Sequence, residues 1–299
     1  MLKTARFIAA GALLLVQLAL TSPAALADVP GTWSIRTSTN GAGANLTLVV
    51  DEPKGSSDTS SFPVDPESLG LRDALAAERE RQVEFVLRRE AGSFACSGLA
   101  GRSHGAGTFL FTPNDAFVAG MRERGFTNLS ASDIVLAAVV NLVLHFVDDV
   151  FGAGYHHLSY RMLIVLRSLG IDGPYMRAMQ AAFAAPEPID PEQLIPLRSL
   201  GVSPQYLSEL RDAGLPLSGP DDAIRARALH VDAPYVLGLG HAGYAHLGFE
   251  DVLRLRSVGI DAGFIERVEA HGFAHPTLEQ LIRLKTMKIV SAASEGATP

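Results

Sequence analysis

Residues 101–105 carry the residue pattern of a serine hydrolase. They read Gly-Arg-Ser-His-Gly, which matches the G-x-S-x-G motif, in which a serine nucleophile sits on a tight turn between a strand and a helix. Here the motif leads instead into alternating apolar residues at 108–111, and no regular alternation of strands and helices surrounds it. We therefore interpret residues 101–105 as a glycine-rich turn between two strands. A hydrolase that uses Ser103 is the alternative.

A second candidate for chemistry is a group of potential metal ligands between His145 and His157. Asp148, Asp149 and His156 lie between them, and His145 and Asp149 have the spacing of neighbours on one helix face. The sequence contains no H-E-x-x-H motif of the kind that binds zinc in metallopeptidases. We expect ordinary solvated side chains here and predict no catalytic residue, cofactor or metal. An enzyme that uses the His145–His157 cluster stays as an alternative.

Three histidines recur at one position of a repeat that is described below. They are His157, His246 and His275, and the last two lie about 29 residues apart. Equivalent residues of stacked units become neighbours, so two imidazoles could bind a metal or respond to pH. The simpler interpretation is that they are loop residues just before a helix. We retain them as candidate binding residues.

Basic residues recur at another position of the same repeat. Arg167, Arg198, Arg227 and Arg256 follow one another at intervals of about 29 residues, and Lys285 continues the series. Such a row could bind a partner that carries carboxylates or phosphates. The simpler interpretation is a set of solvated helix faces that pair with nearby carboxylates. Arg167, Arg198 and Arg256 are the arginines that we name as candidate binding residues.

The elements that position these residues come from a sequence that repeats about every 29 residues. The phrase Leu-Arg-Ser-Leu-Gly at 197–201 recurs at 166–170, and it returns as Leu-Arg-Ser-Val-Gly at 255–259. A fixed period in this range is typical of repeat architectures. An aromatic residue in each unit marks six copies: Phe117, Phe146, Tyr175, Tyr206, Tyr235 and Phe264.

Each unit predicts two short helices. A helix N-cap residue precedes apolar residues at helical spacing, and a glycine such as Gly201 then closes the first helix. A second N-cap, often followed by proline, starts the helix that carries the aromatic residue, and Gly214 or its equivalent ends it. Two such helices cannot bury their apolar faces alone, so we predict a solenoid of stacked helix–turn–helix units over residues 113–290. Two departures stand out: residues 134–150 predict one longer helix, and residues 183–190 predict an irregular loop.

The N-terminus predicts export. Lys3 and Arg6 precede an apolar run and the sequence Ala-Leu-Ala at 25–27, which is typical of a signal peptide that is cleaved after Ala27. We expect a periplasmic or secreted protein without a membrane span after cleavage; a retained anchor is the alternative. Loss of the two basic residues leaves 23 basic and 32 acidic residues, which changes the formal net charge from −7 to −9. This balance argues against a nucleic-acid partner.

Residues 28–112 predict a small antiparallel sheet. Apolar residues alternate around Trp33, Leu48, Phe85 and Phe109, which indicates about five strands with one apolar face. We predict a loop at 53–63, one short helix within 66–81, and a disordered tail at 291–299. Cys96, the only cysteine, falls on the apolar alternation, which predicts a buried and unreactive thiol. The fold class is therefore α+β, with the sheet capping the helical repeats.

The sequence also resembles a known family. Three features carry the resemblance: residues 85–94 (Phe-Val-Leu-Arg-Arg-Glu-Ala-Gly-Ser-Phe), residues 105–111 (Gly-Ala-Gly-Thr-Phe-Leu-Phe) and the helical repeats after them. They are similar to extracytoplasmic repeat regions of some bacterial antirepressor metallopeptidases of the β-lactam-sensor type, and to secreted relatives of those regions. The resemblance covers about residues 31–290. It implies a bacterial envelope location and a binding or sensing role. The zinc motif and transmembrane helices of that family are missing from this sequence, so no catalytic residue is carried over.

We therefore expect an exported, non-enzymatic repeat protein that binds a protein or peptide partner in the bacterial envelope. The alternatives are an unrecognised hydrolase or metal-dependent enzyme, and a self-associating structural protein. The sequence does not specify the oligomeric state.

Overall fold

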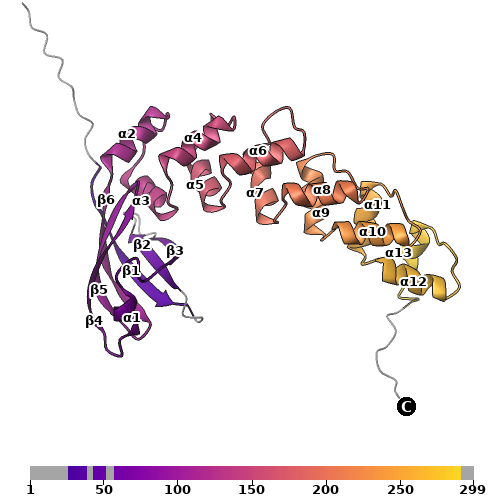
Figure 1. Cartoon of the computed structure of the whole chain (residues 1–299), viewed down its shortest axis with the longest axis horizontal. Helices are drawn as coiled ribbons and strands as arrows, with labels where there is room; N and C mark the ends of the chain where they lie inside the picture. Colours follow the sequence, from indigo (N-terminus) through magenta and orange to yellow (C-terminus); the bar gives the residue numbers. More distant parts are fainter. Residues whose placement is uncertain (1–25, 39–42, 52–56, 291–299) are drawn as a thin grey trace, which may run out of the picture.

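The computed structural model describes residues 26–38, 43–51 and 57–290, and it shows a six-stranded antiparallel sheet followed by a series of short helices (Figure 1). The mixed α+β class is therefore confirmed. Most of the predicted signal peptide, and the predicted tail at 291–299, lie outside the described residues.

The sheet has the strand order β3-β2-β1-β6-β5-β4, and all neighbours are antiparallel. The prediction of about five strands was wrong, because β3 occupies much of the segment that was assigned to a loop. The sequence of β3 begins with polar residues and shows little apolar alternation, and pairing with β2 makes it an edge strand. The strands are β1 (Val29–Thr37), β2 (Ala44–Asp51), β3 (Ser57–Val64), β4 (Arg81–Arg89), β5 (Gly92–Gly101) and β6 (His104–Pro113).

One face of the sheet forms a core with the first helices. Trp33, Phe94 and Phe111 are almost fully buried there, and the Phe94 and Phe111 rings lie with their centroids 4.6 Å apart. The helices α1 (Arg72–Ala76) and α3 (Ala131–Val139) contact strands of the sheet. The sheet is also strongly curled: the Cζ atom of Arg89, on one edge strand, lies 5.8 Å from the ring centroid of Phe62, on the other edge strand.

The helical part follows β6 after a single residue, Asn114, whose side chain caps α2. Figure 1 shows the later helices extending away from the sheet as one elongated stack. Many of the helices contact the next but one along the chain, for example α6 with α8 and α7 with α9. The remaining helices are α2 (Asp115–Glu123), α4 (Leu144–Gly152), α5 (Tyr160–Ser168), α6 (Gly173–Ala182), α7 (Pro191–Ser199), α8 (Pro204–Asp212), α9 (Pro220–Ala228), α10 (Ala233–His241), α11 (Phe249–Ser257), α12 (Ala262–Ala270) and α13 (Leu278–Thr286).

The predicted long helix over residues 134–150 is wrong, because α3 and α4 are separate helices bent by 82°. Asn141 adopts a left-handed conformation (φ 55°), and the Leu142 amide donates a hydrogen bond back to Ala137, which closes α3. The N-cap residue of α4, Val143, makes no side-chain hydrogen bond to the helix. Instead, the Glu90 carboxylate of the β4–β5 turn accepts a hydrogen bond from the Leu144 amide. A contact distant in sequence thus supplies the cap that sequence inspection did not find.

Within the described residues, no single helix is both long and apolar enough to cross a membrane; only α3 and α4 taken together reach that length and hydropathy, across their bend. The chain between α6 and α7 forms no helix, as predicted for residues 183–190. All six marker aromatics lie on helices, and five are buried while Tyr175 is half-buried.

Candidate functional site

The row of basic residues has a recurring geometry. Arg256 of α11 donates a hydrogen bond from Nε to the Leu229 carbonyl (3.1 Å), and its Cζ lies 4.6 Å from the ring centroid of Tyr235. Arg227 and Arg198 make the same pair of contacts one and two units earlier, respectively. Arg167 donates to the Asn141 carbonyl and lies over Phe146, and Lys285 lies over Phe264. We call these five residues, Arg167, Arg198, Arg227, Arg256 and Lys285, the cation row.

Helix ends and aromatic rings explain this geometry. Leu169, Leu200 and Leu229 are the C-cap residues of α5, α7 and α9, and carbonyls at a helix C-terminus lack intrahelical partners and carry partial negative charge. An arginine from the next helix but one satisfies such a carbonyl, and its flat guanidinium rests on the ring of the helix between them. Each of these arginines therefore joins two consecutive units of the stack.

The rings under the cation row also hold the units together. The Tyr206 hydroxyl donates a hydrogen bond to the Val231 carbonyl (2.7 Å), and the Tyr235 hydroxyl donates to the Ile260 carbonyl (2.8 Å). Burial raises the pKa of Tyr206 to about 12 and raises that of Tyr235 as well. Both hydroxyls therefore stay protonated donors at neutral pH.

The arginines of the cation row do not pair with carboxylates. In the part of the chain that the structure describes, none of them lies within 4.0 Å of an acidic group, and only Nε of each has a hydrogen-bond acceptor. The expectation of ion pairs is therefore wrong for the row. It holds for other residues on the same helices, since Arg225 pairs with Glu250 and Arg254 with Glu279, both at 2.7 Å.

Apolar side chains accompany the cation row. The C-cap residues whose carbonyls accept the arginine hydrogen bonds are leucines, and they are only partly buried. Leu200 is 37% exposed and Met287, the C-cap residue of α13, is 63% exposed. Each arginine thus makes a polar contact with a backbone carbonyl, and the side chain of the residue that carries this carbonyl is apolar. An edge with both characters can hold a charged group and an apolar side chain next to each other.

The candidate histidines do not assemble into a metal site. His157, His246 and His275 are exposed, and the last two have left-handed backbones in the loops before α11 and α13. The nearest acid to His275 is Glu269, with 3.5 Å between Nδ1 and Oε1. Among the residues at 26–38, 43–51 and 57–290, no group of three or more potential ligands lies close enough to hold a metal ion.

Ser103 sits on the turn of the β5–β6 hairpin. Arg102 and Ser103 both have positive φ (52° and 68°), as a two-residue type I′ hairpin requires. The Ser103 amide and carbonyl bond to Leu75 and Thr37, while the His104 ring faces Glu80 at 3.4 Å. Within the described residues, no histidine hydrogen-bonds to the Ser103 hydroxyl.

The His145–His157 cluster is also dispersed. His145 faces Asp149 at 3.4 Å and is largely exposed, as its helical spacing suggested. Asp148 accepts two hydrogen bonds from Arg124, the C-cap residue of α2, and this contact holds the pKa of Asp148 below its usual value. The His156 ring packs against Phe151. Of these contacts, only the Arg124–Asp148 pair connects the end of α2 with α4, and His145 and His156 have separate partners.

No protein-family model matches this chain, and no curated protein sequence matches it. Its function therefore has to be argued from the geometry of its own residues.

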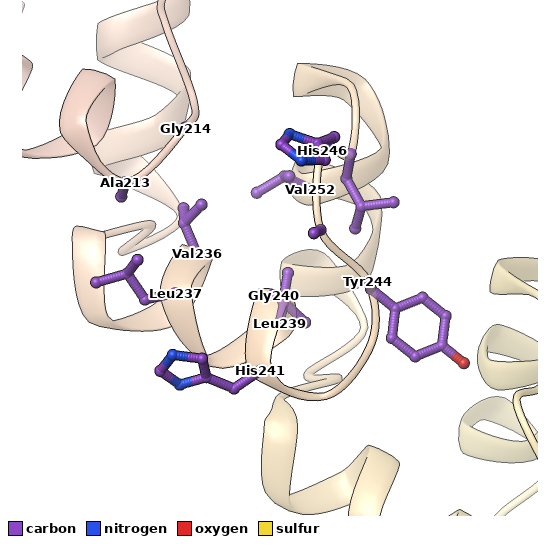
Figure 2. A pocket seen from close by; sticks show the side chains of 12 residues that line it. Ala213, Gly214, Val236, Leu237, Leu239, Gly240, His241, Tyr244, His246 and Val252 are labelled. Atoms are coloured by element: carbon purple, nitrogen blue, oxygen red, sulfur yellow. The ribbon is translucent and has the colours of Figure 1, made fainter.

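A small hollow beside α10 is a feature that the sequence analysis missed (Figure 2). Its volume is about 170 Å³, below the range of about 300–1,000 Å³ that drug-sized ligands need. Gly240 leaves it open, because a Cβ atom there would meet nothing within 4 Å. Figure 2 shows His246 and His241 at its borders, with the Tyr244 ring pointing away from it. The sequence feature that could have indicated this hollow is Gly238-Leu239-Gly240. The equivalent residues of α8, one unit earlier, are Glu209-Leu210-Arg211, with larger side chains at the two glycine positions.

Proposed function

We propose that this protein is an exported, non-enzymatic binding module whose helices form a solenoid of about 29-residue units capped by the sheet. The recurring caps, aromatic positions and arginine contacts support the solenoid, because each links one unit to the next in the same way. The signal-peptide pattern and the family resemblance support a location in the bacterial envelope. We further propose that the module binds a protein partner along the cation row.

The observation that carries the proposed binding site is a series of fixed cations without acidic partners. The Nε hydrogen bond and the ring contact hold each guanidinium of Arg198, Arg227 and Arg256 in place. Their Nη donors have no acceptor among the described residues. A side chain that is already ordered loses little conformational entropy when it binds, so such a row is prepared for a ligand with acceptor groups.

The enzyme alternatives receive no comparable support. Catalysis by Ser103 needs a base within hydrogen-bond reach, and catalysis by the His145–His157 cluster needs convergent groups in a pocket. The contacts of these residues instead belong to a hairpin turn and to exposed helix surfaces.

Site-specific photo-crosslinking in the living bacterium tests the proposed function. A photoreactive residue is introduced at Leu200, beside the cation row, or at Leu237, an exposed leucine (48%) on α10 that lines the hollow, which no residue of the row lines. We expect Leu200 to form an adduct with a defined protein, and Leu237 not to form it. The absence of any adduct from Leu200, or the same adducts from both positions, would reject the cation row as the binding site.

A further inference from the structure

We propose that the cation row binds an extended acidic segment in the polyproline II conformation, with a carboxylate at every third residue and apolar residues between. This inference rests on the proposed binding function and specifies the chemistry of the partner. It follows from three properties of the row: its charge, its spacing and its apolar neighbours.

The charge of the row calls for carboxylates. A guanidinium presents a rigid fork of N–H donors that matches the two oxygens of a carboxylate. In Arg227, for example, Nε already donates to the Leu200 carbonyl and one face of the guanidinium rests on the Tyr206 ring. The edge that carries the two Nη atoms is therefore what remains for a partner. Gly170 and Gly201 lie beside the Nη2 atoms of Arg198 and Arg227, where a Cβ atom would come within 3.4 and 3.8 Å, so no side chain at these positions covers that edge.

The acidic residues of the same turns are already engaged. Asp172, Asp232 and Asp261 are the N-cap residues of α6, α10 and α12, and each accepts a hydrogen bond from a backbone amide at 2.8–2.9 Å. They stabilise helix N-termini, where their charge is favourable. None of them lies within 4.0 Å of a row arginine, so the guanidinium forks remain open to an outside carboxylate.

The spacing of the row selects the conformation of the partner. Each arginine comes from one of the helices α5, α7, α9 and α11, and α7 packs directly on α9. Packed helix axes lie about 8–10 Å apart, so successive cations are about one such distance apart. A polyproline II helix advances about 9 Å per three-residue turn. Two residues of a β-strand cover only about 7 Å, and one turn of α-helix only about 5 Å, so neither matches this spacing.

The apolar neighbours of the row distinguish a peptide from other polyanions. The leucines at 169, 200 and 229 alternate with the arginines along the edge and are partly exposed. A peptide can place proline or leucine against them between its acidic residues. A polyanionic saccharide or a nucleic acid has no apolar side chains for these positions. The edge therefore fits an acidic, proline-rich segment of a protein.

A peptide series tests the inference on the full mature protein. The probe is a fluorescent peptide of Glu-Pro-Leu triplets that spans the row, measured by anisotropy. The control peptides are Gln-Pro-Leu triplets, without charge, and Glu-Pro-Pro-Leu quartets, with the wrong period. We expect the triplet probe to bind at least about tenfold more tightly than either control, and to weaken with added salt.

Variants with a matched control locate the binding. Leu200→Glu adds a repelling charge beside the row without removing any arginine contact, and Leu237→Glu adds the same charge at an exposed position elsewhere. We expect Leu200→Glu to weaken binding of the triplet probe by about tenfold and Leu237→Glu to change it less than twofold. Equal effects of the two variants would overturn the proposed location.

The outcomes separate this inference from the proposed function. Equal binding of the triplet and quartet peptides overturns the three-residue period. Tighter binding of an anionic saccharide such as heparin overturns the choice of a peptide, and failure of every peptide to bind overturns the inference as a whole. In each case, an adduct from Leu200 in the crosslinking experiment would still support a protein partner at the row.

Discussion

The cation row makes a prediction about stability that separates its arginines from ordinary surface arginines. Arg254 and Arg256 lie two residues apart on α11. Arg256 bonds the Leu229 carbonyl and rests on Tyr235, whereas Arg254 makes an exposed ion pair with Glu279. We predict that Arg256→Met destabilises the protein by about 2 kcal/mol, and that Arg254→Met costs less than about 0.5 kcal/mol.

The magnitude follows from the two contacts of Arg256. A hydrogen bond from a charged donor contributes about 1.5 kcal/mol at the lower end of its range, which applies because the side chain is half-exposed and water can replace it. A cation over an aromatic ring adds about 0.5 kcal/mol at such a site. Methionine keeps the apolar stem, so the change removes mainly these two terms.

Urea unfolding followed by circular dichroism measures the difference between the two variants, and hydrogen exchange of the amides in α9 and α10 locates it. We expect Arg256→Met to lower the protection of amides near Leu229 and Tyr235, and Arg254→Met to leave them unchanged. If Arg254→Met is as destabilising as Arg256→Met, the arginine contacts between units contribute no special stability, and the account of the row given above is refuted.

Three further predictions concern single residues. Gly240→Ala should raise the free energy of unfolding by about 1 kcal/mol, since Gly240 lies inside a helix and a Cβ atom there meets open space. Gly243→Ala should lower the free energy of unfolding by about the same amount, because the φ angle of Gly243 is +89°. Thermal unfolding measures both changes. The free energy of unfolding should fall between about pH 10 and pH 12, because the unfolded chain loses the Tyr206 proton near its ordinary pKa of 10 while the native state, with a pKa of about 12, retains it; Tyr206→Phe should reduce this fall. Cys96, which is buried and whose pKa is raised to about 12 by that burial, should react with a thiol reagent only after unfolding, and rapid labelling of the native protein would contradict this.

Much of the helical part was predictable because each helix end has its own local signal. Gly170, Gly201 and Gly259 adopt the left-handed conformation that their position in the repeat predicted. Asn141 and His230 do the same without being glycine, with φ 55° each. The position in the repeat therefore determined the backbone better than the residue type did. At Asn141 we predicted one long helix where the structure has two, because the apolar pattern of residues 134–150 outweighed the weak helix-stop signal of a single asparagine.

Contacts that are distant in sequence were harder to predict. β3 depends on its pairing with β2, and α4 depends on a cap from Glu90, 54 residues away. The hollow beside α10 depends on what surrounds Gly240 in space. Local patterns contain no information on such partners, so inspection of the sequence could not reveal them.

The cation row shows why sequence alone could not decide between a structural and a binding role for its arginines. The pattern Leu-Arg-Ser-Leu-Gly places each arginine near a helix end, where solvent exposure is the usual expectation. In the structure, the Nε atom and one face of the guanidinium serve the contact between units, while the Nη edge has no partner among the described residues. The two roles thus use different atoms of the same side chain. Substitution by lysine tests how the ligand is recognised, because Arg227→Lys keeps the positive charge but lacks the planar fork of donors. If the row binds carboxylates bidentately, this variant should weaken the Glu-Pro-Leu probe nearly as much as Arg227→Met does; a variant that binds like the wild type would mean that charge alone attracts the ligand.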